Sequence, residues 1–127
     1  MRVSDIVVKD PSTEKIIAAC FSVHSEIGPG FSEKVYHNAL KHEFERRGIS
    51  YDTEKEFKIS YQSKMVGAIR IDLIVENKVI VEVKAVANVI PEIFRQQILA
   101  YLKASKLPVG LIVNFGTKSC EIKRFIK

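Results

Sequence analysis

Two carboxylates and a lysine interrupt otherwise apolar segments in the second half of the chain. Asp72 lies within Ile71-Asp72-Leu73-Ile74-Val75, and Glu82 and Lys84 lie within the apolar run 79–85. Because successive side chains of a strand point to opposite faces, Glu82 and Lys84 share one face. A run this apolar is typical of a buried central strand, where unpaired charges are costly. We therefore expect these charged groups either to pair with each other or to perform chemistry.

The loop between these two segments decides whether Asp72 joins Glu82. Suppose that residues 76–78 form a three-residue loop with Val75 opposite Val79. The residue numbers of opposed positions then add up to 154, so Asp72 lies directly opposite Glu82. Directly opposed side chains share a sheet face, so two carboxylates would meet on one buried face. Their repulsion favours a bound cation, and hard oxygen ligands suit Mg²⁺ or Mn²⁺. A two-residue loop would reverse the alternation and remove this pairing.

A divalent cation held by two carboxylates beside a lysine is a site for phosphodiester hydrolysis. The metal polarises the phosphate and lowers the pKa of a bound water, and Lys84 would stabilise developing negative charge or orient the nucleophile. The alternative is a buried network of Asp72, Glu82 and Lys84 that forms ion pairs without catalysis. Such networks contribute little to stability, which favours the functional interpretation.

Apolar spacing and the placement of glycine and proline divide the chain into eight elements. Helices are predicted from Pro11 to Gly28, from an N-cap at Ser32 to Arg47 before Gly48, and from Pro91 to Leu107. Strands are predicted at 51–61, 65–75, 79–85, 109–115 and 120–126. Within the second strand, Ile69, Ile71, Leu73 and Val75 are expected on one face. The order α-α-β-β-β-α-β-β predicts a mixed α/β (α+β) domain.

Composition limits the classes of protein that remain. A chain of 127 residues with 46% hydrophobic residues predicts one globular domain over residues 1–127. The longest apolar stretch, Ile16 to Phe21, is too short to span a bilayer, and Met1 to Asp5 lead into no signal segment. Cys20 and Cys120 form no metal-binding pattern and are expected as reduced core thiols. We therefore expect a cytoplasmic protein that does not enter a membrane.

The charge is unevenly distributed along the chain. The net charge is +5, but residues 61–127 hold 11 basic and 5 acidic side chains, a net of +6. This basic half weakly favours a polyanionic partner such as nucleic acid.

Three motifs together resemble a known superfamily. Asp72, nine further residues and then Glu82-Val83-Lys84 resemble the D…(D/E)xK signature of the PD-(D/E)XK nucleases, whose core has a similar αβββαβ order. Gln97 and Tyr101, on one face of the third helix, resemble the QxxxY motif of the RecB-like branch. The segment 30–36, Gly-Phe-Ser-Glu-Lys-Val-Tyr, resembles the GxxExxY motif that names a family of small proteins within this superfamily. The resemblance extends from about residue 12 to the end.

The resemblance implies a PD-(D/E)XK fold, with a mixed central sheet between helices, and a Mg²⁺- or Mn²⁺-dependent nuclease. DNA is the expected substrate and RNA the second choice. The metal would be held by Asp72, Glu82, the Val83 carbonyl and, directly or through water, Glu33. Glu33 has an alternative interpretation as a first-turn acid favoured by the helix dipole. Ile71 stands where the superfamily's name has proline, a tolerant position.

The resemblance also implies roles around the metal. Lys84 would be the catalytic lysine, and Gln97 and Tyr101 would position it or the phosphate. These two helix residues could instead form an ordinary amphipathic edge with the tyrosine hydroxyl in solvent. His24 is expected to be a surface or half-buried helix residue rather than a metal ligand.

Contacts to the substrate are assigned to Tyr36, Arg70 and Arg95. Tyr36 could instead pack beneath Glu33, and a solvated face would explain both arginines. A domain this small has little room for a separate recognition module, which favours a homodimer. The alternative function is a non-catalytic module that binds nucleic acid or protein on the same fold, but the acids and the lysine of the signature are all present.

Overall fold

The computed structural model describes residues 10–126. Residues 1–9, which include the N-terminal stretch examined for a signal segment, and Lys127 lie outside this description. The elements follow the predicted order: α1 (Pro11–Ile27), α2 (Glu33–Arg47), β1 (Tyr51–Tyr61), β2 (Lys64–Val75), β3 (Val79–Lys84), α3 (Glu92–Ser105), β4 (Val109–Asn114) and β5 (Glu121–Ile126). The mixed α+β class is confirmed.

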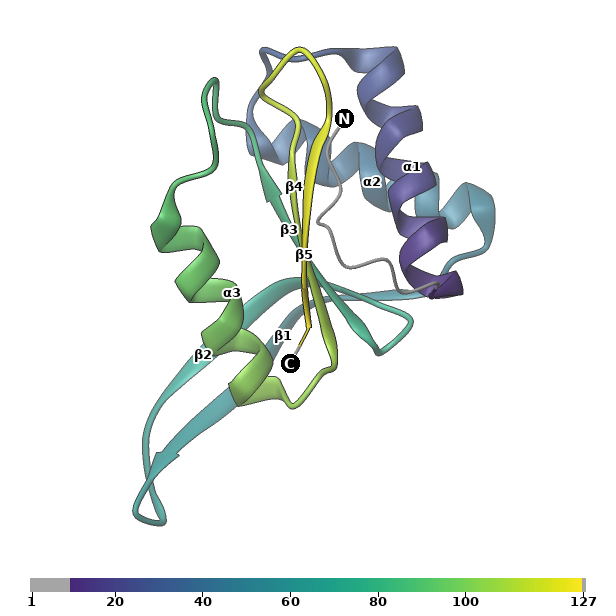
Figure 1. The fold of residues 1–127 in the computed structure, drawn as a ribbon. Coiled ribbons are helices and arrows are strands. Elements are labelled where there is room, and N and C mark those ends of the chain that lie inside the picture. Colours follow the sequence, from purple (N-terminus) through teal and green to yellow (C-terminus); the bar gives the residue numbers. More distant parts are fainter. Residues whose placement is uncertain (1–9, 127) are drawn as a thin grey trace.

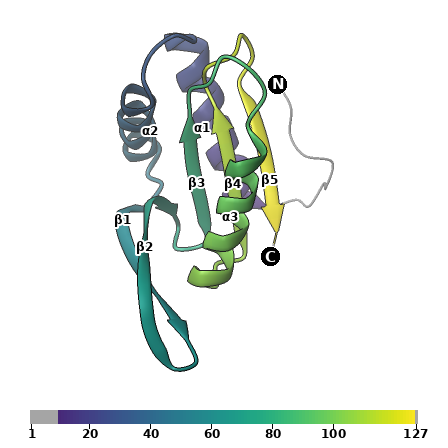
Figure 2. The same ribbon diagram turned by 90° about the vertical axis from the view of Figure 1, so that its left-hand side faces the viewer.

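The five strands form one sheet in the order β1-β2-β3-β4-β5. Only the β3–β4 pair is parallel, because α3 crosses over between these strands, and the other neighbouring strands are antiparallel. Strand β3 therefore occupies the centre of the sheet, as its apolar sequence predicts. The β1–β2 hairpin extends well beyond the end of the sheet formed by β3, β4 and β5 (Figure 2).

Helices cover the sheet on both faces (Figure 1). Helices α1 and α2 pack on one face over Val79, Val81 and Val83 of β3. Helix α3 packs on the other face, where Ile80 of β3 joins Ile98 of the helix. Two apolar cores thus lie on either side of β3, and the alternation of its side chains divides them between the cores.

Local signals fix the ends of the helices. Asp10 caps α1 by accepting a hydrogen bond from the Ser12 amide at 3.1 Å. Gly48 follows α2 with φ of 71°, a left-handed conformation that glycine adopts without strain. Ser32 occupies the predicted N-cap of α2, but its side chain makes no capping hydrogen bond. No helix in the described part of the chain is long and apolar enough to cross a membrane.

The side-chain alternation predicted for β2 does not persist through Asp72. Leu73 packs with α1 and α2, whereas Ile71 packs with α3, although the two are only two residues apart. Opposite Asp72, Glu54 of β1 has a left-handed φ of 53°, and the regular pairing is interrupted there. The hairpin twists at this point, so the apolar face of β2 changes sides at Asp72.

Candidate active site

Strands β2 and β3 separate close to their connecting turn. Their register places Ile74 opposite Ile80 and Val75 opposite Val79, so the predicted three-residue loop is confirmed. The regular pairing ends at Ile74, and the two strands diverge beyond it. Asp72 and Glu82 therefore lie on the two arms of a fork rather than in one continuous ladder.

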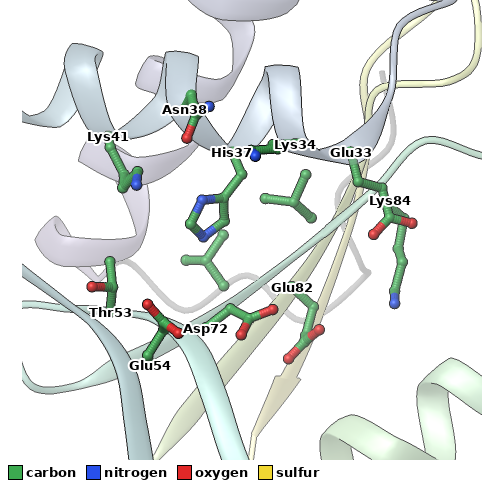
Figure 3. A pocket seen from close by; sticks show the side chains of 12 residues that line it. Glu33, Lys34, His37, Asn38, Lys41, Thr53, Glu54, Asp72, Glu82 and Lys84 are labelled. Carbon is green, nitrogen blue, oxygen red and sulfur yellow. The ribbon is translucent and has the colours of Figure 1, made fainter.

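A pocket of about 620 Å³ opens at this fork, between the strands and α2. Its lining contains the predicted acids and lysine together: Glu33, Lys34, His37, Asn38, Lys41, Thr53, Glu54, Asp72, Val81, Glu82, Val83 and Lys84. Figure 3 shows the side chains of Glu54, Asp72 and Glu82 in a row on the strand side, opposite those contributed by α2. The fold thus brings residues of four elements, α2, β1, β2 and β3, to one pocket.

The two signature carboxylates differ in their surroundings. Asp72 is exposed and Glu82 is half-buried, so the prediction that both meet on one buried face is wrong. Divergence of the strands is the reason, because it opens Asp72 to solvent. Burial raises the pKa of the Glu82 carboxyl to about 7; the positive charge of Lys84 lowers it, and the negative charges of Asp72 and Glu33 raise it. Glu82 thus lies in an environment that disfavours its anion unless a cation is nearby.

Lys84 extends toward α3 rather than forming a pair with Glu82. Its Nζ lies 3.9 Å from the ring centroid of Phe94, in a cation–π contact. Within residues 10–126 no ion pair joins Lys84 to a carboxylate. The alternative of a closed network of ion pairs among the three charges therefore does not describe this arrangement.

A buried asparagine holds the chain that follows Lys84. Asn114 lies beside Lys84 in the β3–β4 ladder and is fully buried. Its Oδ1 accepts from the amides of Val86 and Gly116, each at 3.0 Å, and its Nδ2 donates to the carbonyls of Val86 at 3.1 Å and Asn88 at 3.4 Å. This amide uses its full hydrogen-bonding capacity to fix the segment after the end of β3.

The Val83 carbonyl is placed by the alternation of the backbone. The Lys84 carbonyl accepts from the Phe115 amide at 2.9 Å, on the β4 side of the strand. Successive carbonyls of a strand point to opposite edges, so the Val83 carbonyl faces the β2 side. There the β2–β3 ladder has already ended at Ile80. This carbonyl is therefore directed into the fork that holds the carboxylates.

Helix α2 brings Glu33 to the pocket and buries Tyr36. Glu33 is exposed in the first turn, whereas Tyr36 is fully buried and stacks on Phe115 with centroids 4.7 Å apart. The Tyr36 hydroxyl donates to the Gly28 carbonyl at 2.6 Å and accepts from the Phe31 amide at 3.2 Å. These contacts leave no surface for a substrate, so the predicted substrate role of Tyr36 does not fit. The residue instead fixes the loop between α1 and α2.

Tyr101 on helix α3 is half-buried and lies within electrostatic range of the acids. Burial raises the pKa of the Tyr101 hydroxyl, and the negative charges of Glu82 and Asp72 raise it as well. Gln97 lies one turn earlier and is half-buried. Neither side chain lines the pocket, and both lie on the α3 side of the sheet.

The two arginines predicted to bind substrate lie outside the pocket. Arg70 is exposed on β2, with its Nη1 3.8 Å from Glu54. Arg95 pairs with Glu92 at 3.8 Å and lies over the ring of Phe125 on β5, on the far side of α3 from β2. Of these two, only Arg70 is adjacent to a pocket residue.

His24 has a structural environment. It is buried, its Nε2 lies 2.9 Å from the Thr117 carbonyl oxygen, and its ring stacks on Phe115 at 6.2 Å. It is buried rather than at the surface or half-buried, so that expectation is wrong, and it does not line the pocket. Both cysteines are free and buried, as predicted.

Comparison with protein families identifies the chain. A family model described as the PD-(D/E)XK nuclease superfamily matches residues 10–125. The chain belongs to the PD-(D/E)XK nuclease superfamily. Searches of curated proteins and of solved structures found no significant match.

The donor set of this PD-(D/E)XK pocket can be compared with the needs of a divalent cation. No three His, Cys, Asp or Glu side chains within residues 10–126 are grouped closely enough to hold a metal ion by themselves. The fork nevertheless combines Asp72, Glu82 and the Val83 carbonyl, all hard oxygen donors. Mg²⁺ commonly keeps several waters and binds through one or two carboxylates together with substrate phosphates. The residues therefore fit Mg²⁺ or Mn²⁺ in an open site.

Sequence reasoning missed several groups in the pocket, among them Glu54 and His37. Glu54 shares the strand side of the pocket with Asp72. In the β1–β2 register the residue numbers of opposed positions add up to 126, which places Glu54 opposite Asp72, so this register would have indicated its position. His37 lines the pocket from α2, and its spacing of four residues from Glu33 was an available signal. Phe94 was also missed as the partner of Lys84, although it lies three residues before Gln97 on the same helix.

Proposed function

We propose that this protein is a divalent-metal-dependent nuclease that hydrolyses phosphodiester bonds, in DNA before RNA. The observation that carries the proposal is the meeting of Asp72, Glu82 and Lys84 in one open pocket at the fork of β2 and β3. Membership of the nuclease superfamily supports it. The raised pKa of Glu82 supports a cation at this place, because a bound cation would offset the burial of its charge.

A bound Mg²⁺ or Mn²⁺ would supply Lewis-acid chemistry toward water and phosphate. Asp72, Glu82 and the Val83 carbonyl would hold it, and Glu33 at the rim would orient water. Lys84 would place its ammonium group where negative charge develops on the phosphate. For that role its Nζ must turn from the Phe94 ring toward the carboxylates, a change of side-chain rotamer on a strand that Asn114 holds in place.

Within the superfamily, we place the chain in the GxxExxY family of the RecB-like branch. The three motif positions have separate tasks that support this. Gly30 has a φ of 110°, Glu33 lines the pocket, and Tyr36 fixes the preceding loop. Gln97 and Tyr101 would act from α3 as positioning residues for Lys84 or the phosphate, since Tyr101 is coupled electrostatically to Glu82 and Asp72.

Substrate binding would draw on the surplus of basic residues after residue 60. Arg70, two residues from Asp72, is the better placed of the two predicted arginines. A homodimer would let a domain of this size build a longer groove for nucleic acid. We further propose a cytoplasmic location, which the two free thiols support.

Cleavage assays with matched variants test the proposal. Purified protein is incubated with plasmid, single-stranded DNA and RNA, in Mg²⁺, in Mn²⁺ and in EDTA. We expect metal-dependent cleavage that is reduced by two or more orders of magnitude in Asp72→Asn and Lys84→Ala. His42→Ala, an exposed change on α2 outside the pocket, should cleave like the wild type.

The same assay separates the enzyme from the alternative, a non-catalytic module that binds nucleic acid or protein. Binding without cleavage in every metal, unaffected by Lys84→Ala, would refute the nuclease and favour that module. Cleavage that persists equally in Asp72→Asn would show that a contaminating enzyme is responsible.

A further inference from the structure

A set of basic side chains on α2 forms the wall of the pocket that faces the carboxylates. Lys34, His37 and Lys41 are spaced three and four residues apart, so they share one helix face, and all three line the pocket. Figure 3 shows them on the opposite side from Asp72 and Glu82. We call these three residues the α2 strip. None of the three is a fixed position of the nuclease signature or of the GxxExxY motif, in which Lys34 occupies a variable position.

The donors of the α2 strip have no partners in the part of the chain that the structure describes. His37 Nε2 is buried without a hydrogen-bond partner. Lys34 and Lys41 form no ion pair within residues 10–126, although four carboxylates line the same pocket. A buried polar atom without a partner costs about 1–3 kcal/mol, so in a native protein its presence indicates a ligand or water that supplies one.

The chemistry of both walls restricts what this ligand is. Two ammonium groups and an imidazole donor attract anions, whereas the carboxylates of the opposite wall attract cations. Phosphate groups meet both conditions, because their oxygens bind lysine on one side and a divalent cation on the other. From Lys34 to Lys41 the helix rises about 10 Å, which is longer than one phosphate group. The strip is therefore long enough to contact successive phosphates of a strand.

We propose that the α2 strip binds consecutive phosphates of a nucleic-acid strand and so aligns that strand with the carboxylates of the fork. In its Nε2-protonated form, His37 donates a hydrogen bond to a phosphate oxygen, and the two lysines contact the phosphates on either side. This inference rests on the proposed nuclease function for the choice of substrate. It assigns binding, rather than bond cleavage, to α2.

Binding measured without metal tests the strip independently of cleavage. Fluorescence anisotropy in EDTA gives Kd for a labelled single-stranded DNA and for an RNA of the same sequence, over a range of salt concentrations. We expect Lys34→Ala and Lys41→Ala each to raise Kd about three- to ten-fold and to lower the slope of log Kd against log salt by about 0.7. His37→Ala should weaken binding, and His37→Gln, which keeps a donor, should restore part of it.

Matched controls separate this site from general charge effects. Lys118→Ala removes the same charge from an exposed position between β4 and β5, and His42→Ala removes an exposed histidine from another face of α2. Both should bind like the wild type. A wild-type protein that binds neither probe would overturn the proposal, as would strip variants with unchanged Kd or a Lys118→Ala variant that is equally impaired.

A metal-ligand role for His37 is a separate outcome of the test. If His37→Ala lowers Mn²⁺ affinity in titration calorimetry but leaves the Kd for DNA in EDTA unchanged, the histidine binds metal and the proposal fails. Failure of the nuclease function gives another pattern. A wild type that never cleaves but binds through Lys34 and Lys41 would refute the nuclease function and support the α2 strip. Cleavage by the wild type, together with unchanged Kd in the strip variants, would refute the α2 strip and support the nuclease function.

Discussion

Replacing Glu82 by Gln removes a titration that the fold has moved from an ordinary pKa of 4.5 to about 7. Burial is the main cause, and the nearby charges of Asp72 and Glu33 add to it. The folded protein thus holds this proton more tightly than the unfolded chain. The contribution of this carboxyl to the free energy of unfolding is fully present below about pH 4.5, where both states are protonated. It is lost as the pH rises through 7, because the unfolded chain ionises freely whereas the folded state must bury the anion.

The size of the effect follows from the two pKa values. They differ by about 2.5, and each pH unit of difference corresponds to about 1.4 kcal/mol, which gives a loss of roughly 3 kcal/mol by alkaline pH. Glutamine has nearly the same shape and no titration in this range. The Glu82→Gln variant should therefore be more stable than the wild type by roughly this amount at about pH 8.5, and the two should converge near pH 4.5.

Urea unfolding across this pH range in EDTA measures the difference between the two proteins, so that titrations common to both cancel. Adding Mn²⁺ at alkaline pH should raise the unfolding free energy of the wild type more than that of Glu82→Gln, because the cation binds the folded anion. Parallel pH profiles for the two proteins would refute the reasoning about burial. An equal gain from Mn²⁺ in both would refute Glu82 as a ligand.

Two further predictions concern residues around Lys84. Phe94→Leu removes the cation–π contact that holds Lys84 away from the carboxylates but keeps an apolar side chain, so single-turnover cleavage should rise about three- to thirty-fold. Phe94→Tyr keeps the contact and should cleave like the wild type, and equal rates in the two variants would argue against a role for this contact. Asn114→Leu leaves several partly buried backbone groups without partners, so the free energy of unfolding should fall by about 3 kcal/mol in urea titrations. The exposed change Asn38→Ala should lower it by less than about 0.5 kcal/mol. An Asn114→Leu variant as stable as the wild type would contradict that assignment.

The sequence was sufficient to predict the elements because local rules define their ends. Gly48 ends α2 in the left-handed conformation that its position after Arg47 indicates. The β2–β3 register was predictable for the same reason. Glu76 and Asn77 both adopt a φ of 53°, which closes the predicted three-residue loop. These features depend on a few neighbouring residues and need no knowledge of the tertiary structure.

What the sequence did not predict depends on long-range geometry. The exposure of Asp72 arises because β2 leaves β3 beyond Ile74, and strand alternation assumes that neighbouring strands stay paired. The burial of Tyr36 depends on its stacking against Phe115, which lies 79 positions later in the chain. The orientation of α3 likewise depends on Gly110, where an added Cβ would lie 2.7 Å from Ile98 Cδ1.

The fork explains how an apolar sheet carries a polar site. A carboxylate on a paired central strand would be sealed between the two helix layers at a high desolvation cost. Because pairing stops at Ile74, Asp72 remains in solvent and Glu82 is only half-buried, so the desolvation cost falls mainly on one group. That cost is moderate enough to keep Glu82 within reach of ionisation near neutral pH. A cation that binds there would offset the remaining cost, so the same divergence that weakens the sheet prepares the site.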